Sequence, residues 1–260
     1  MADNPNVTYE TSDGVARVTI DREERRNAIN AEVVSGISDS LGRAEADDAV
    51  RVVVLTGTGE RAFCAGGDLG GVADAPRVAQ HFIRGEVGDL FKQMRSSRLP
   101  IVARVNGHAL AGGFGLMLAC DLVVAADDAE MGTPEVNIGL WPFMISAVIQ
   151  RDVPRKIALE MMMTGRRMGA EEAARWGFIN RVVPRAELDV AIDEMTAVLT
   201  SKSPLILSLG KRSFYSVEDM DLAPALEYLS GMLTVCLESE DTIEGVTAFL
   251  EKRHPEWKGR

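Results

Sequence analysis

The sequence has few cysteines, few aromatic residues, no excess of positive charge and no long apolar run. Among its 260 residues are 3 cysteines, and aromatic residues make up 5%. Cys64, Cys120 and Cys236 are far apart and form no Cys-x-x-Cys pair. We therefore expect free, buried thiols in a reducing cytoplasm, and neither a disulfide nor a metal site.

The charge and the start of the chain narrow the class of protein further. The formal net charge is −11, which disfavours binding to nucleic acid or to an anionic membrane, because both need a basic face. No apolar stretch reaches the ~18 residues of a membrane helix. The polar, acidic start at 1–6 does not resemble a signal peptide. These features predict a cytoplasmic protein.

The apolar residues that are present, 46% of the chain, form patterns of alternating strands and helices. Strands are expected at 15–20, 50–56, 100–105 and 122–126, with a helix at 28–41 between the first two. Strands that alternate with helices predict an α/β fold with a parallel sheet, with its strands in the first half of the chain. Later segments show helical periodicity, at 154–163, 170–176, 186–200, 204–215, 222–237 and 242–253.

Two glycine-rich turns, 63–68 and 109–115, each follow a strand-like run. Their backbone N–H groups could converge on one oxygen atom, as in an oxyanion hole, which stabilises charge that develops during acyl chemistry. The second turn leads into an apolar helical stretch at 116–120. Glycines at such a place more often permit close packing, so either turn alone would be ambiguous. The presence of both favours the oxyanion hole.

Several motifs resemble those of the enoyl-CoA hydratase/isomerase (crotonase) superfamily. They are Arg26-Asn27-Ala28-Ile29-Asn30, 63–68, 105–113, Cys120-Asp121-Leu122, Thr133-Pro134-Glu135 with Ile138-Gly139-Leu140, and Thr164-Gly165-Arg166. The resemblance runs from about residue 7 to 257. It implies a crotonase-like spiral of ββα units at 1–200 and a C-terminal helical trimerisation region at 201–260. It also implies an acyl-CoA substrate, no prosthetic group, and a homotrimer or a hexamer built as a dimer of trimers.

The resemblance also assigns site residues. Gly67 and Gly112 would supply the oxyanion N–H groups, and Glu135 would transfer the proton. The residues expected to contact coenzyme A are Arg25, Arg26, Ala28, Ala65, Gly66, Asp68 and Leu69, with Ala65 against the adenine and the two arginines near the phosphates. Arg25 and Arg26 could equally belong to a solvated charge cluster with the acidic residues at 21–24.

The chain departs from the family's hydratases at Gly115, where they carry a second glutamate. A single carboxylate, Glu135, favours double-bond isomerisation, because one base can remove a proton and return it. Hydration or dehydration is the alternative, and a non-catalytic coenzyme A-binding relative is a further one. If the pocket otherwise fits, Gly115→Glu should raise hydratase activity. Phe143 stands where hydrolytic relatives carry an aspartate, which disfavours hydrolysis.

Two further features have more than one interpretation. The apolar segment 140–145 could reshape an acyl pocket or simply fill the core. His108 could line the pocket, although a packed or solvent-facing histidine is the more common case.

Overall fold

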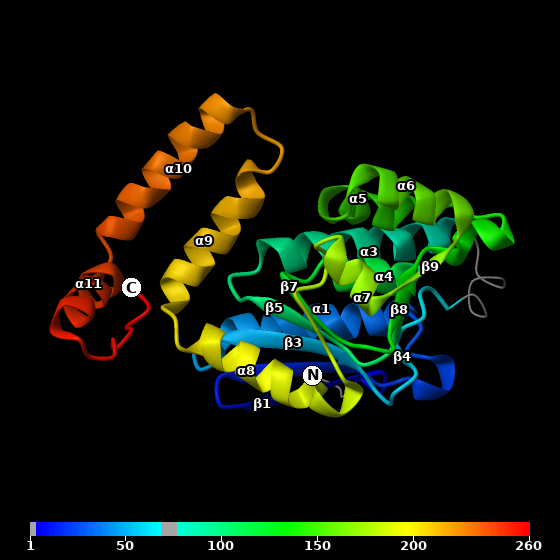
Figure 1. The fold of residues 1–260 in the computed structure, drawn as a ribbon, viewed down its shortest axis with the longest axis horizontal. Helices are drawn as coiled ribbons and strands as arrows, with labels where there is room; N and C mark the ends of the chain where they lie inside the picture. The colour runs from blue at the N-terminus through cyan, green and yellow to red at the C-terminus, as the bar shows by residue number, and fades with distance from the viewer. Residues whose placement is uncertain (1–3, 69–76) are drawn as a thin grey trace.

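The computed structural model describes residues 4–68 and 77–260. Their strands form two sheets (Figure 1). The larger sheet, in the order β1-β2-β3-β5-β7-β10, comprises β1 (Val7–Ser12), β2 (Val15–Ile20), β3 (Val52–Gly57), β5 (Ile101–Val105), β7 (Leu122–Ala126) and β10 (Arg181–Val183). The smaller sheet, in the order β4-β6-β8-β9, comprises β4 (Ala62–Cys64), β6 (His108–Leu110), β8 (Glu130–Gly132) and β9 (Arg167–Gly169). Apart from the antiparallel pairs β1–β2 and β8–β9, neighbouring strands in these described ranges are parallel.

Helices cover the sheets and continue beyond them. They are α1 (Ala31–Ala46), α3 (Arg77–Ser96), α4 (Gly112–Leu118), α5 (Phe143–Asp152), α6 (Arg155–Thr164), α7 (Ala170–Arg175), α8 (Leu188–Thr200), α9 (Pro204–Val217), α10 (Leu222–Leu237) and α11 (Glu240–Glu251), with short 3₁₀ helices η1 (Glu23–Arg25), η2 (Pro134–Ile138) and η3 (Arg185–Glu187). The first helix begins where the Asn30 side chain accepts a hydrogen bond from the Val33 N–H. Such caps satisfy N–H groups that have no partner inside the helix.

The chain repeats a unit of two strands and a helix. A strand of the larger sheet leads to a short strand of the smaller sheet and then to a helix, as in β3-β4-α3 and β5-β6-α4. This arrangement confirms the expected α/β fold with stacked ββα units. Since β4 and β6 pair in parallel, the segments that follow them leave the small sheet at the same edge. The fold thus brings the two glycine-rich turns together.

The central strands of the larger sheet, β3, β5 and β7, are buried on both faces. On β3, Val53 and Leu55 belong to the main core, whereas Val52 and Val54 belong to a second core that includes residues of α8. Successive side chains of a strand point to opposite faces, which explains this division. It also explains why β3 is an unbroken run of apolar residues in the sequence, as expected for a strand covered on both sides.

The expectation that the strands lie only in the first half of the chain is wrong. Strands β9 and β10 lie in the second half, and each has three residues. A segment of this length is too short to show a period of two, so no pattern could predict it. Helices α3 and α5 are likewise not predicted by the patterns described above. The predicted strands and helices are confirmed, with ends that differ by a few residues.

The C-terminal helices α9, α10 and α11 extend away from the sheets as an arm (Figure 1). A buried ion pair fastens α9 to the core, since Lys211 Nζ lies 2.7 Å from Asp121 Oδ2, and the Tyr215 hydroxyl donates to Asp121 Oδ1 at 2.9 Å. Along the arm, α10 has no buried residue. The predicted boundary after residue 200 coincides with the end of α8. Within the described ranges, no helix has the length and apolar character needed to cross a membrane.

The cysteines differ in their burial. Cys64 and Cys120 are buried free thiols, as expected, whereas Cys236 is partly exposed. Desolvation by burial raises the pKa of Cys64 to about 12. This thiol therefore stays protonated near neutral pH and acts as a small apolar group in the core.

Candidate active site

The first glycine-rich turn directs one N–H group away from its neighbours. A parallel bridge pairs Ile29 with Gly67: the Ile29 N–H donates to the Gly66 carbonyl at 2.7 Å, and the Asp68 N–H donates to the Ile29 carbonyl at 2.8 Å. Backbone groups of adjacent residues in an extended segment point to opposite sides. The Gly67 N–H therefore points away from Ile29 and is left for another acceptor.

The second turn begins helix α4. Its first residue is Gly112, whose N–H precedes the first intrahelical hydrogen bond and so lacks a helical partner. The preceding residue, Ala111, has φ 51° and ψ −127°, a conformation that costs a residue with a side chain about 1–3 kcal/mol. The Ala111 N–H donates to the Gly132 carbonyl at 2.8 Å, which holds this turn against β8.

The two turns lie against each other. A Cβ atom on Gly112 would stand 3.6 Å from the Gly67 nitrogen, and a Cβ on Gly66 would stand 2.6 Å from Ala111 Cβ. Among the described residues, neither the Gly67 nor the Gly112 N–H donates a hydrogen bond to the backbone or to a side chain. Two free, neighbouring N–H groups have the geometry of an oxyanion hole. The structure thus brings the two predicted donors together.

Glu135 supplies a carboxylate beside these N–H groups. It belongs to η2, and its carbonyl accepts a hydrogen bond from the Leu140 N–H at 3.0 Å, which fixes the turn that presents the side chain. Its Oε2 atom is buried and has no hydrogen-bond partner among the described residues. Desolvation raises the pKa of Glu135, although its own backbone N–H partly opposes this effect. A carboxylate of this kind is suited to accept a proton near neutral pH.

One cavity of about 650 Å³ contains all three groups. Its described lining includes Gly67, Gly112 and Glu135, and an apolar wall formed by Leu140, Trp141, Phe143, Met144 and Ile145. Among the described lining residues, Glu135 is the only one with a titratable side chain. An apolar cavity with one carboxylate and two free N–H groups is suited to a neutral acyl group with a carbonyl oxygen.

Comparison with known proteins identifies the family. A sequence model described as enoyl-CoA hydratase/isomerase matches residues 10–260. The chain belongs to the enoyl-CoA hydratase/isomerase family. It is 39% identical over 251 residues to a carnitinyl-CoA dehydratase of Escherichia coli K12, covering 95% of both chains, and 36% identical over 255 residues to one of Proteus mirabilis, covering 96% of this chain and 97% of that one.

Solved structures of this family share the fold. The human enoyl coenzyme A hydratase domain-containing protein 3 superposes with a TM-score of 0.93 at 30% identity, covering 97% of this chain and 100% of that chain. An enoyl-CoA hydratase of Mycobacterium smegmatis gives a TM-score of 0.94 at 32% identity, covering 97% and 99%. The chain is therefore an enzyme of the crotonase family with the crotonase fold.

Gly115 occupies a position in this family member where no side chain fits. A Cβ atom there would overlap Ile145 Cγ2, and would stand 2.7 Å from Ile145 Cβ and 3.3 Å from Phe91 Cζ. Real Cβ atoms essentially never approach other atoms to less than 3.0 Å. The condition attached to Gly115→Glu, that the pocket otherwise fits, is therefore not met. Segment 140–145 lines the cavity, and within it Ile145 and Trp141 also pack against the core.

The residues expected to contact coenzyme A are distributed over several environments. Arg26 and Ala65 line a second cavity of about 510 Å³, and Ala65 lines the acyl cavity as well. Arg25 is exposed, and Gly66 forms the turn described above. Ala28 is buried, with its carbonyl accepting from Arg22 Nη1. Leu69 lies outside the described residues.

Asp68 forms an ion pair next to Gly67. Its Oδ2 lies 2.9 Å from Arg22 Nη2, and the two side chains are only 19% and 11% exposed. The Arg22 guanidinium also reaches the Ala28 carbonyl, so it connects both sides of the bridge that orients Gly67. This contact favours a structural role for Asp68, and its predicted contact with coenzyme A remains a prediction.

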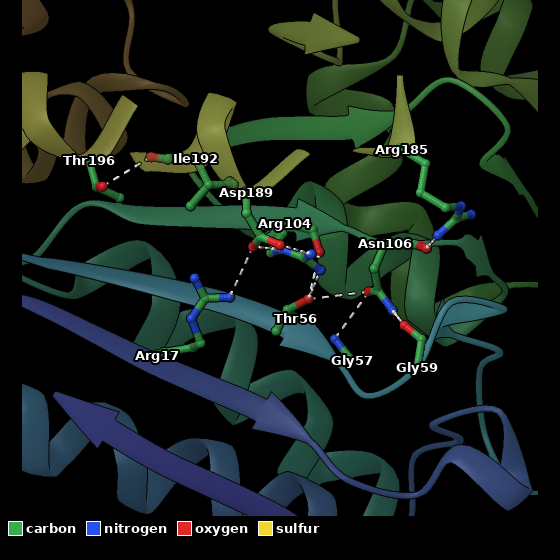
Figure 2. A network of polar contacts seen from close by, with 10 residues as sticks. All are labelled: Arg17, Thr56, Gly57, Gly59, Arg104, Asn106, Arg185, Asp189, Ile192 and Thr196. Carbon is green, nitrogen blue, oxygen red and sulfur yellow. Dashed lines mark hydrogen bonds and ion pairs between the residues drawn. The ribbon is translucent and has the colours of Figure 1, made fainter. Parts of the chain in front are cut away.

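Two buried asparagines that sequence reasoning did not assign to the site hold its first turn. Asn27 and Asn106 both donate to the Ala62 carbonyl, at 2.7 Å and 3.3 Å. Figure 2 shows Asn106 at the ends of the central strands, where it also accepts from the Gly57 N–H and donates to the Gly59 carbonyl. Both residues belong to the quoted motifs, but their contacts cross 35 and 44 positions of sequence.

His108 does not line the acyl cavity. It lines the second cavity with Arg26 and Ala65, and its Nδ1 accepts a hydrogen bond from the Glu130 N–H at 3.2 Å. The side chain is 40% exposed. The interpretation of a packed, partly solvent-facing histidine is confirmed.

Proposed function

We propose that the chain forms the enolate of an acyl-CoA thioester with one carboxylate as its only acid and base. The Gly67 and Gly112 N–H groups bind the thioester oxygen, and Glu135 removes a proton from C2. Two observations carry the proposal: the Glu135 Oε2 atom is buried without a hydrogen-bond partner among the described residues, and Glu135, Gly67 and Gly112 line one cavity. Each N–H group contributes about 2.7–4 kcal/mol to stabilising the developing negative charge.

The reaction that these groups support best is migration of a double bond. Glu135 takes a proton from C2 of a 3-enoyl thioester, and the electron pair moves into a dienolate whose oxygen is held by the two N–H groups. The proton then returns to C4, giving the 2-enoyl thioester. This sequence needs one group that is first a base and then an acid, which corresponds to the single titratable side chain in the described lining.

Dehydration or hydration is the second candidate, favoured by the similarity to proteins named carnitinyl-CoA dehydratase. After taking the C2 proton, Glu135 is an acid that can protonate a hydroxyl group leaving C3. The products are water and a 2-enoyl thioester, and the carboxylate is regenerated. One carboxylate suffices here as well when both groups leave from the same face of the substrate.

Parallel assays with 3-hexenoyl-CoA, 2-hexenoyl-CoA and 3-hydroxyhexanoyl-CoA separate the two reactions. Exchange of the C2 protons of hexanoyl-CoA in deuterated water tests enolate formation directly, independently of the later step. We expect Glu135→Gln to lower exchange and turnover by about 10²–10⁴-fold, the usual contribution of general acid–base catalysis. Tight binding of acyl-CoA without exchange in the wild type would favour the non-catalytic alternative and overturn the proposal.

Coenzyme A would lie along the first turn, next to the acyl cavity. Ala65 lines both cavities, and Arg26 and Arg61 line the second one, so a ligand that continues past Ala65 meets guanidinium groups suited to its phosphates. Arg25, exposed in the same segment, would approach the phosphates from the surface. We expect Arg26→Ala to raise KM for acyl-CoA and leave kcat nearly unchanged.

The C-terminal arm would join copies of this chain into a trimer or a dimer of trimers. Large apolar side chains on the arm are exposed, among them Leu226, Leu233 and Phe249, at 58%, 59% and 81%. Many large, exposed apolar side chains on one part of a soluble protein are typical of an interface. Residues 201–260 would then serve assembly, as the sequence predicts.

A further inference from the structure

The acyl cavity is closed, at the end of the first turn of α4, by the side chain of Ile145. Gly115 lies three positions after Gly112, so a side chain at 115 would project from the same face of α4 as the oxyanion donor. That space is filled by α5, because a Cβ on Gly115 would overlap Ile145 Cγ2. Ile145 is 3% exposed and also lines the acyl cavity.

The side chains around Ile145 in this part of the cavity are almost entirely apolar. Phe91, on α3, stands 3.3 Å from the same Cβ position, and Trp141, Phe143 and Met144 continue the apolar wall. Besides Glu135, the described lining has two polar side-chain groups: the Trp141 indole N–H and the amide of Asn137, which is exposed and lies two residues after Glu135 on the same 3₁₀ helix. A water molecule held for attack needs two or more hydrogen-bond partners. Of the described side chains on the Ile145 side of the cavity, only the Trp141 indole N–H could supply one, and a single donor does not hold a water in place.

We infer that Ile145 determines the reaction specificity of this enzyme: by filling the space beside Gly115, it excludes both a second carboxylate and an ordered water from the part of the acyl cavity next to Gly115. The inference rests on the proposed function, since it assumes that Glu135 forms the enolate. The proton on Glu135 then returns to carbon instead of assisting the addition of water. Gly115 and Ile145 act as one packed unit.

The distances determine which substitutions can open this space. Because Ile145 Cβ itself lies 2.7 Å from the position that a Cβ on Gly115 would occupy, alanine at 145 still obstructs a side chain there, and only glycine removes every obstructing atom of residue 145. Gly115→Glu/Ile145→Gly is therefore the test variant, and Gly115→Glu/Ile145→Ala is its matched control. The two differ by a single methyl group.

The measurement is the ratio of water addition to 2-hexenoyl-CoA over isomerisation of 3-hexenoyl-CoA. We expect Gly115→Glu alone to lower the melting temperature without raising this ratio. The double variant with glycine should raise the ratio by about tenfold or more over Ile145→Gly, since a positioned acid or base contributes at least that much. In the alanine control, Gly115→Glu/Ile145→Ala, the ratio should rise much less than in the double variant with glycine. Ile145→Gly alone admits water beside Gly115 and should raise the ratio about threefold, a small share of a full acid–base contribution.

Three results would overturn the inference. The first is a Gly115→Glu protein with wild-type melting temperature and a raised ratio, because Ile145 would then not obstruct position 115. The second is an unchanged ratio in Ile145→Gly, which is measurable even where the double variant does not fold. The third is a wild type that hydrates faster than it isomerises. Exchange at C2 of hexanoyl-CoA separates these from failure of the proposed function, because only that failure abolishes exchange in the wild type.

Discussion

Two glycines of the site, Gly112 and Gly113, leave room for other atoms where another residue would have a Cβ atom. Gly112 and Gly113 are neighbours in α4, but a methyl group would have different consequences at each. On Gly112 it would lie 3.3 Å from Ile29 Cδ1 and 3.6 Å from the Gly67 nitrogen, whereas on Gly113 it would overlap the Cys64 carbonyl and stand 2.7 Å from its carbon atom. One glycine leaves room for a ligand and the other for the protein's own backbone.

This difference predicts opposite outcomes for two alanine variants. Gly112→Ala should fold with nearly the wild-type melting temperature but lose about 10²–10³ in kcat, because the methyl group occupies the place of the oxyanion. Gly113→Ala should be destabilised by several kcal/mol, as for strained overpacking of a core. Thermal unfolding and turnover of both proteins test the assignment. A fully active Gly112→Ala enzyme would contradict it.

The raised pKa of Glu135 links activity and stability to pH. Because burial raises this pKa above its ordinary value of 4.5, the folded chain holds the proton more tightly than the unfolded chain. At low pH Glu135 is protonated in both the folded and the unfolded chain, so its ionisation does not affect the free energy of unfolding. As pH rises from 4.5 through the raised pKa, ionisation of Glu135 lowers the free energy of unfolding. We expect Glu135→Gln to melt at a higher temperature than the wild type at pH 7, and at the same temperature at pH 4.

Wild-type C2 exchange should show the same titration. Exchange should fall as pH decreases through the raised pKa of Glu135, because only the carboxylate form accepts a proton. A melting temperature of Glu135→Gln below that of the wild type at pH 7 would show that the carboxylate has a stabilising partner.

The Arg22–Asp68 ion pair should affect catalysis more than binding. In Arg22→Met no guanidinium joins Asp68, in the loop that carries Gly67, to the Ala28 carbonyl, so the Gly67 N–H group is less well oriented. We expect kcat to fall about tenfold, which corresponds to about 1.4 kcal/mol of barrier, with KM little changed. Arg104→Met is a matched control. The Arg104 side chain is 16% exposed, and its Nε lies 2.8 Å from Asp189 Oδ1. Neither residue of this pair lines the acyl cavity. Equal losses of kcat in the two variants would indicate a merely structural effect.

The longer helices and strands could be predicted from the periodicity of their apolar residues, whereas the three-residue strands could not. Helix α10 has the predicted bounds, Leu222–Leu237, and β7 has the predicted bounds, Leu122–Ala126. The strands of the smaller sheet have three residues each, and they form because the ββα repeat brings them beside one another. The site follows the same division. Gly67, Gly112 and Glu135 stand in motifs, whereas the packing of Ile145 against Gly115 depends on where α5 lies in space.

The attachment of α9 depends on a buried charge pair. Lys211 also donates to the Met94 and Leu99 carbonyls, at 3.0 Å and 2.8 Å, and burial lowers its pKa while Asp121 opposes that effect. Lys211→Met leaves the Asp121 carboxylate without its cation. We expect the free energy of unfolding to fall by about 3 kcal/mol, since one member of a buried ion pair is removed.

The effect on α9 can be separated from a general loss of packing. In Lys211→Met/Asp121→Asn no uncompensated charge remains, so part of the stability should return. Chemical denaturation measures both free energies, and proteolysis reports whether α9 to α11 loosen first. The pair's role would be refuted if the double variant lost more free energy of unfolding than the two single variants lose together.

At the scale of the whole molecule, the arm has an apolar surface that a single chain leaves in water. Leu226 and Leu233 lie on α10, seven positions and about two helical turns apart, so they share a face. Replacing both by glutamate should dissociate the assembly that we propose, because charges would have to be buried in its interface. Light scattering should give a mass near three or six chains for the wild type and one for the variant. Glu227→Gln, on the same helix, is the control, and a monomeric wild type would refute the assembly.

The packing of Ile145 against Gly115 also bears on how this enzyme could change over evolutionary time. A glutamate at 115 meets Ile145, and a glycine at 145 alone leaves a void in the core and weakens α5. A lineage starting from this sequence would thus have to pass through a less fit intermediate before a second carboxylate could be of use. Each of these two residues therefore disfavours substitution of the other. Because of this contact, no single mutation at either position introduces a useful second carboxylate.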